Sequence, residues 1–313
     1  MKPKYLVVAL SIAVAAMLGF LAASCGAGEG AESAGPVPSE PGAETGTTAE
    51  TAGTTSEGET GKASETVPPA NKATVSYQVW FTEGETLYVA KRTQNATRRI
   101  GTAALEALFD GPDSFEAENG VGTAVPQGTQ LLGLTIDDGI ATADLTSEFE
   151  SGGGSLAMFL RLAQVVCTLD QFPTVDGVLF KLDGEPVDVF SGEGIVLDHP
   201  VGCKDYEDVL PVILVTSPTV GERVSSPVTV EGTANVFEAN VTVVVLDEND
   251  EEIARTFTTA TCGSGCRGDF SVDVEYDVDH EESGTIVVQD DDAAGTGTPP
   301  HQVRIPVVLT PKA

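Results

Sequence analysis

The chain has 313 residues, of which 48 are acidic and 16 basic, and its formal net charge at pH 7 is −32. Such an acidic chain excludes nucleic acid as a partner and disfavours direct binding to anionic lipid head groups, because both ligands require basic patches. The charge suits a soluble domain held outside the cell.

The N-terminus has the layout of a signal peptide. Lys2 and Lys4 precede a stretch from Tyr5 to Ala23 without a charged residue, and small residues lead into Cys25. The absence of a basic stop-transfer cluster after this stretch favours cleavage over retention. The stretch resembles the bacterial lipobox, in which the cysteine is lipidated and becomes the new N-terminus.

We therefore predict a lipoprotein signal peptide over 1–24 and lipidation of Cys25. This predicts an extracytoplasmic protein anchored to the bacterial cell membrane. An uncleaved anchor helix is the alternative, since about 20 apolar residues suffice to span a bilayer. Residues 25–72 are dominated by Gly, Ala, Ser, Thr, Glu and Pro and contain no aromatic residue, so we predict a disordered acidic tether.

The cysteine count agrees with export. Five cysteines is an odd number, and lipidation of Cys25 leaves four. The short spacing in "CGSGC" makes Cys262 and Cys266 the natural local pair, which leaves Cys167 to pair with Cys203. A zinc site is the competing hypothesis, but the histidines are scattered along the sequence, and we expect neither a metal nor another cofactor.

Residues 73–208 are the first predicted folded domain. "TVSYQVWFT" and "TLYVAKRT" predict a hairpin, and "ATRRIGTAALEALFDGP" predicts a helix. A second hairpin is predicted at Asp138-Gly139, a helix with Ser155 as its N-cap follows, and Asp183-Gly184 marks a third hairpin. This order of elements predicts an α+β domain with helices on a mainly antiparallel sheet.

Residues 209–313 contain no helical pattern. Seven short strands with turn residues between them predict an all-β, immunoglobulin-like sandwich. The strands are expected in "VILVTSP", "SPVTVEGTA", "NVTVVVLD", "EIARTFTTA", "DFSVDVEYDV", "GTIVVQD" and "QVRIPVVL".

Acidic groups in the second domain offer possible calcium ligands. Asp273, Glu275, Asp277 and Asp279 alternate with apolar residues and would share one face of a strand. A solvated outer face explains them better than a calcium site. The run "DENDEE" (247–252) lacks the glycine of a calcium loop and predicts a hairpin turn instead.

No motif in the sequence supports catalysis. A nucleophile elbow and a phosphate-binding glycine loop are both absent, and the histidines lie in proline-flanked or acidic stretches. A cell-wall hydrolase would need two facing acids, for which Asp137, Asp138 and Asp144 are the candidates. Asp137 and Asp138 lie at a predicted turn, so we predict no catalytic residues and a protein that is not an enzyme.

Residues 75–200 resemble the GerMN domain of bacterial sporulation and spore-germination proteins. The resemblance rests on "AALEALFDGP", "AVPQGTQLLGLTIDDGIATADLTSEF" and "LAQVVCTLDQFPTVDGVLFKLDGEPV", in which "TLDQFPTVDGV" is the most specific run. Residues 212–309 resemble the immunoglobulin-like domain that often follows, through "VTSPTVGERVSSPVTVEGTANVFEANV" and "RIPVVL". The resemblance implies an envelope-associated lipoprotein of sporulation or germination, and it supplies no catalytic residue.

The leading hypothesis is a non-catalytic, lipid-anchored scaffold that binds envelope proteins or peptidoglycan, in sporulation, germination or envelope signalling. One alternative is a module that senses cations or wall fragments for an envelope kinase. Calcium or muropeptides would then raise its thermal stability. A wall hydrolase is the other alternative, and it predicts a pocket with paired acids of shifted pKa.

Overall fold

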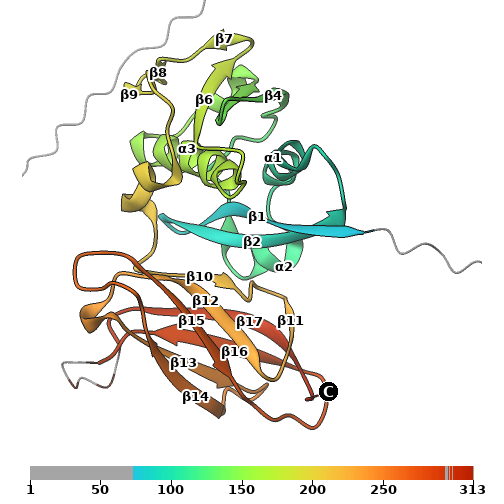
Figure 1. Ribbon diagram of the computed structural model, residues 1–313, viewed down its shortest axis with the longest axis vertical. Helices are drawn as coiled ribbons and strands as arrows, with labels where there is room; N and C mark the ends of the chain where they lie inside the picture. Colours follow the sequence, from blue (N-terminus) through green and yellow to red (C-terminus); the bar gives the residue numbers. More distant parts are fainter. Residues whose placement is uncertain (1–72, 293–294, 296, 298, 313) are drawn as a thin grey trace, which may run out of the picture. The chain divides into compact units, whose positions relative to one another are not determined.

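The computed structural model describes residues 73–292, 295, 297 and 299–312 (Figure 1). The predicted signal peptide (1–24), the lipidation site Cys25 and the tether (25–72) lie outside the described residues. The described residues belong to one compact unit, an α+β domain followed by a β-sandwich. The predicted fold class is therefore confirmed. Within the described part, no helix has the length and apolar character needed to cross a membrane.

The first domain begins with the predicted hairpin. Strands β1 (Thr74–Glu83) and β2 (Thr86–Asn95) pair antiparallel along their whole length. The short strand β3 (Val121–Gly122) pairs with the end of β1, which gives a sheet of order β2-β1-β3. The rest of that edge of β1 has no strand beside it among the described residues.

A second sheet has the order β4-β5-β6-β7. Its turns are those predicted, since Asp138 (φ 52°) with Gly139 (φ 83°) and Asp183 (φ 49°) with Gly184 (φ 86°) adopt the left-handed conformation of two-residue hairpins. Strands β5 and β6 are parallel because a helix joins them, so the sheet is mixed. Its strands are β4 (Leu131–Asp137), β5 (Ile140–Leu145), β6 (Gly177–Leu182) and β7 (Glu185–Pro186).

Three α-helices pack with these sheets: α1 (Ile100–Asp110), α2 (Ser114–Glu118) and α3 (Ser155–Asp170). Helix α3 packs on β1 and α1, and most of its residues are buried. The predicted N-cap at Ser155 is wrong. Gly154 is the N-cap, and the Ser155 hydroxyl donates to the carboxylate of Glu193. The strands β8 (Val189–Phe190) and β9 (Ile195–Val196) and the 3₁₀ helices η1 (Ser147–Glu150) and η2 (Cys203–Val209) complete this domain.

The second domain is the predicted sandwich. One sheet has the order β10-β12-β15 and the other β11-β17-β16-β13-β14. The seven predicted strands are present, and β11, which pairs parallel with β17, was not predicted. The strands are β10 (Ile213–Ser217), β11 (Arg223–Ser225), β12 (Val228–Ala234), β13 (Asn240–Leu246), β14 (Glu252–Thr259), β15 (Gly268–Val274), β16 (Glu282–Gln289) and β17 (Gln302–Thr310), with the 3₁₀ turn η3 (Phe237–Ala239) before β13.

Candidate functional site

Polar side chains of α3 hydrogen-bond to the edge of β1 that lacks a strand partner. Gln164 Nε2 donates to the Trp80 carbonyl at 3.0 Å, and the Trp80 N–H donates to Thr168 Oγ1 at 3.0 Å. Gln171 accepts the Gln78 N–H at 2.8 Å and donates to the Gln78 carbonyl at 2.7 Å. Because buried backbone groups need partners, these side chains replace a neighbouring strand and lock α3 onto the hairpin.

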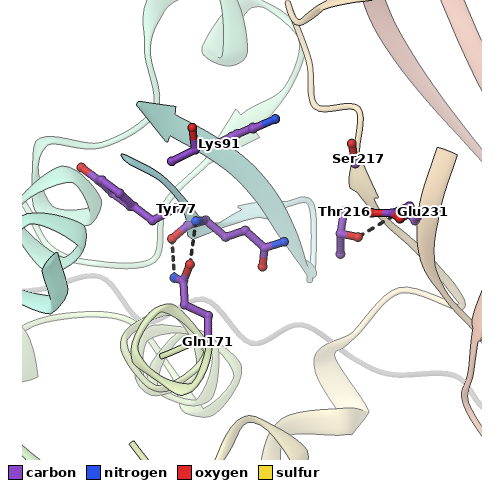
Figure 2. Close-up of a pocket in the computed structure, with 8 residues that line it drawn as sticks. Tyr77, Lys91, Gln171, Thr216, Ser217 and Glu231 are labelled. Carbon is purple, nitrogen blue, oxygen red and sulfur yellow. Dashed lines mark hydrogen bonds between the residues drawn. The ribbon is translucent and has the colours of Figure 1, made fainter. Parts of the chain in front are cut away.

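A polar cleft of about 500 Å³ opens beside Gln171 (Figure 2). Tyr77 and Lys91 of the first hairpin line it, together with Ser217 and Glu231 of the sandwich. These side chains offer hydroxyl, ammonium and carboxylate groups that can bind polar ligands. Burial raises the pKa of the Tyr77 phenol, whose hydroxyl donates to the Ala103 carbonyl at 3.5 Å.

Residues of both domains fix the walls of this cleft. The backbone N–H of Val220 donates to the Tyr88 hydroxyl at 3.1 Å, and Lys91 pairs with Glu222 at 2.9 Å. Leu214 of β10 is 5% exposed and packs into the hydrophobic core of the first domain. An apolar anchor on β10 and two polar contacts between β2 and the connection after β10 therefore hold the domains together.

Two disulfides join the cysteine pairs named in the sequence analysis. Cys167 on α3 is bonded to Cys203 at the start of η2, with the Cα atoms 4.7 Å apart. Cys262 is bonded to Cys266 in the connection between β14 and β15. The first disulfide ties α3 to the segment that leads into the sandwich. The second closes a local loop.

Comparison with known protein families identifies both domains. The Germane family, described as "Sporulation and spore germination", matches residues 71–188. The Gmad2 family, described as "Immunoglobulin-like domain of bacterial spore germination", matches residues 212–296. The chain carries a Germane (GerMN) domain and a Gmad2 domain. The suspected pairing of a GerMN domain with an immunoglobulin-like domain is thereby confirmed.

Solved structures similar to this chain include GerMN domains. The first GerMN domain of the sporulation protein GerM from Bacillus subtilis is 24% identical, with a TM-score of 0.36, over 42% of this chain and 99% of that one. The tandem GerMN domains of the same protein are 16% identical, with a TM-score of 0.37, over 65% of this chain and 62% of that one. A putative lipoprotein from Clostridium perfringens is 20% identical, with a TM-score of 0.32, over 44% of this chain and 93% of that one. Among curated proteins, none matches this chain.

The "TLDQF" run, on which the GerMN resemblance largely rests, has a structural role in this chain. Thr168 and Gln171 belong to it, and both bind the backbone of β1. The sequence alone marked this run as the most specific part of the GerMN resemblance, but it did not predict the contacts of the run with β1. The signal that could have found it is the spacing of Gln164, Thr168 and Gln171, which places polar side chains on one face of an otherwise apolar helix.

Arg161 is a buried cation in the core of the Germane domain that sequence analysis did not single out. It is 3% exposed and donates to the carbonyls of Phe149, Ala124 and Gly152. Burial lowers the pKa of its guanidinium, which stays charged at neutral pH. Arg161 therefore fixes two segments around the first turns of α3, the connection between β5 and α3 and the loop after β3.

The acids considered for a hydrolase serve the hairpins of the Germane domain. Asp137 is exposed at the end of β4, and Asp138 is exposed at the turn after it. The Asp144 carboxylate accepts the backbone N–H of Gly184 at 2.9 Å, which links β5 to the turn between β6 and β7. Asp144 therefore already has a structural partner.

The acidic groups of the Gmad2 domain lie on its surface. Asp273, Glu275, Asp277 and Asp279 are exposed while Val274 and Tyr276 between them are buried, as the alternation predicted. The strand is shorter than predicted, because β15 ends at Val274 and only Asp273 of the four acids lies on it. The predicted turn over 247–252 connects β13 to β14, where hydrogen bonds from the backbone N–H groups of Glu251 and Asn249 hold the pKa of the Asp247 carboxyl below its usual value.

One group of potential metal ligands also lies in the Gmad2 domain. Glu248, His280 and Glu282 bring ligand atoms within 4.8 Å of one another. Sequence analysis did not find the group, because Glu248 lies in the connection between β13 and β14, whereas His280 and Glu282 lie just before and at the start of β16. Glu248 and His280 are exposed, and exposed groups of this kind are common without a metal.

Proposed function

We propose that the protein is a non-catalytic, lipid-anchored extracytoplasmic protein that binds protein or cell-wall partners in sporulation or spore germination. The observation that carries the proposal is the combination of a Germane and a Gmad2 domain in one compact unit. Both family descriptions name sporulation or germination, and neither names a reaction.

The disulfides support the extracytoplasmic location. Structural disulfides persist in oxidising compartments and are rare in the reducing cytoplasm. Cys167 is 1% exposed, so its bond to Cys203 lies in the core and serves stability. An exported protein with the predicted lipid on Cys25 would present both domains outside the membrane.

The fixed arrangement of the two domains supports a binding role. Leu214, Tyr88 and Lys91 hold the sandwich against the first hairpin, so a partner meets one preformed surface. A preformed surface loses little conformational entropy on binding. Within the Germane domain, Asp144, Gln171 and Arg161 stabilise the fold through hydrogen bonds to backbone groups.

The test uses the tethered full chain in the envelope of a spore-forming host. Crosslinking and affinity purification from intact cells should recover a defined envelope protein or wall fragment, and deletion of the protein should impair sporulation or germination. Recovery of no partner, together with normal sporulation and germination, would disprove the proposal. Metabolic labelling with a clickable fatty acid, lost in Cys25→Ala, tests the anchor, and a label that persists in Cys25→Ala contradicts it.

A further inference from the structure

A second concave surface of the Germane domain lies at the outer edge of the mixed sheet. We call it the β4 groove and define it by Arg98, Arg99, Leu134, Ile136 and Phe172, which line a volume of about 240 Å³. Strand β4 is the last strand of its sheet, so one of its edges has no strand partner among the described residues.

Apolar side chains extend along this strand. Leu132 is 51% exposed and Ile136 is 43% exposed, and Ile136 shares a face of β4 with Leu134, because alternate residues point to the same side. Leu132 lies where the pairing of β4 with β5 shifts its register, between Leu131 and Gly133. An exposed apolar stripe on an open strand edge is a typical place for an extended peptide to add a strand. The exposed Asp137 ends the stripe at the turn.

The two arginines of the β4 groove differ from the other arginines of the chain. Both are exposed, and neither side chain has a hydrogen-bond or ion-pair partner within the part of the chain that the structure describes. Every other arginine donates to a carboxylate or to backbone carbonyls. No acid lies in the first turn of α1, directly after Arg99, so these charges stay unneutralised.

We propose that the β4 groove binds an extended acidic segment of a partner protein, in which carboxylates alternate with apolar side chains. This inference rests on the proposed binding function and names the surface and the chemistry of the partner. The apolar side chains would pack on Leu132 and Ile136, and the carboxylates would pair with Arg98 and Arg99.

The test measures peptide binding to the purified full chain in detergent by fluorescence anisotropy. The probe is a fluorescein-labelled peptide with four glutamates alternating with three valines, and the control probe has lysine in place of each glutamate. We expect the acidic probe to bind and the lysine probe to fail. Arg98→Gln/Arg99→Gln should weaken binding on the order of tenfold, since each exposed ion pair contributes up to about 1 kcal/mol.

Matched variants distinguish binding at the β4 groove from a nonspecific effect of the protein's net charge. Lys204→Gln/Lys312→Gln removes the same charge from exposed lysines outside the groove and should leave the affinity unchanged. Ile136→Ser should weaken binding without loss of fold, because Ile136 is exposed. No binding of the acidic probe, or equal binding to both double variants, overturns the proposal.

Other ligands of the β4 groove would give different results in these binding measurements. A soluble muropeptide that binds in an Arg98- and Arg99-dependent manner, where the acidic probe does not, overturns the proposal in favour of the cell wall. A synthetic peptide of residues 26–72 that binds more tightly than the probe assigns the groove to the chain's own tether and also overturns it. If Arg98→Gln/Arg99→Gln still crosslinks to the envelope partner, the β4 groove is not the binding surface, and the proposed function stands.

Discussion

The side-chain amide of Gln171 makes both hydrogen bonds to the backbone of Gln78 that a neighbouring β-strand would make. The same amide nitrogen also donates to the Thr168 carbonyl at 2.7 Å, which fixes its orientation at the end of α3. One glutamine therefore closes a strand edge, extends the last turn of a helix and forms part of the wall of the polar cleft.

Gln171→Ala should destabilise the Germane domain. The substitution leaves the N–H and carbonyl of Gln78 without their partners, and each orphaned group in a partly buried place costs about 1–3 kcal/mol. Urea denaturation of the purified protein should show a loss of about 2–4 kcal/mol in the free energy of unfolding. Gln302→Ala is the control, since the exposed side chain of Gln302 hydrogen-bonds only to the Gln289 side chain. Equal stability of the two variants would contradict a structural role for Gln171.

Tyr88→Phe should loosen the contact between the domains. The phenylalanine keeps the ring and removes the hydroxyl that accepts the Val220 N–H. Hydrogen exchange at the Val220 amide should become faster, on the order of fivefold, for a lost bond of about 1 kcal/mol. Tyr276→Phe also removes a buried tyrosine hydroxyl, but one that donates within the sandwich. If it accelerates exchange at Val220 as much as Tyr88→Phe does, the effect is global unfolding and the prediction is wrong.

Stability should fall in alkaline solution. Burial, the largest cause in each case, raises the pKa of Tyr88 and Tyr206 above that of an exposed phenol, which is about 10. Above that pH the unfolded chain loses these protons while the folded protein keeps them, so the free energy of unfolding decreases as pH rises. Urea denaturation at a series of pH values from about 8 to about 11, which spans the pKa of an exposed phenol, should show this decrease. Tyr88→Phe/Tyr206→Phe should make it smaller, and an unchanged slope would exclude these groups as its source.

The two disulfides should contribute unequally. A longer closed loop restricts the unfolded chain more, and the cysteines are separated by 36 residues in Cys167–Cys203 and by 4 in Cys262–Cys266. Cys167→Ala/Cys203→Ala should cost about 4 kcal/mol of stability, and Cys262→Ala/Cys266→Ala about 2 kcal/mol. Denaturant titration of the two double variants checks the order. A larger loss from the second pair would show that loop entropy does not control the difference.

Arg161→Met should destabilise the loops that precede α3 more than α3 itself. Methionine has a similar length but cannot donate, so the carbonyls of Phe149, Ala124 and Gly152 lose a charged partner. We expect a loss of about 3 kcal/mol in the free energy of unfolding, since hydrogen bonds to charged groups are worth about 1.5–3 kcal/mol. Arg161→Lys should recover only part of it, because an ammonium lacks the planar fork of donors. Full recovery of stability by Arg161→Lys would mean that only the positive charge is needed at this position.

Local signals in the sequence were enough to predict much of the fold. The turns at Asp138-Gly139 and Asp183-Gly184 require a left-handed backbone, which Asp and Gly supply, so the hairpins could be placed from short stretches. The helix α2 carried an equally local signal that was overlooked. The Asp113 carboxylate accepts the Glu116 N–H, and the Glu116 carboxylate accepts the Asp113 N–H, which is a capping box.

Features that depend on distant residues could not be predicted. Parallel pairing of β5 with β6 follows from the path of α3. Pairing of β11 with β17 joins residues 85 positions apart, such as Arg223 and Val308, beyond the reach of local patterns. The polar cleft needs Lys91 and Glu231 to come together from two domains. For the same reason, the sequence could predict which residue types form a site, but it could not predict how these residues are arranged in space.

The position of β17 affects the order in which the two domains can fold during synthesis. β17, the last strand in sequence, lies between β11 and β16 inside its sheet, so the Gmad2 sandwich cannot close until residues 302–310 have been made. The sheets of the Germane domain need no strand beyond β9. Because domains fold as units from the N-terminus while the chain is made, the Germane domain can be complete while the sandwich still exposes unpaired strands. A chain that stops short of β17 would therefore pair a folded first domain with an aggregation-prone second one.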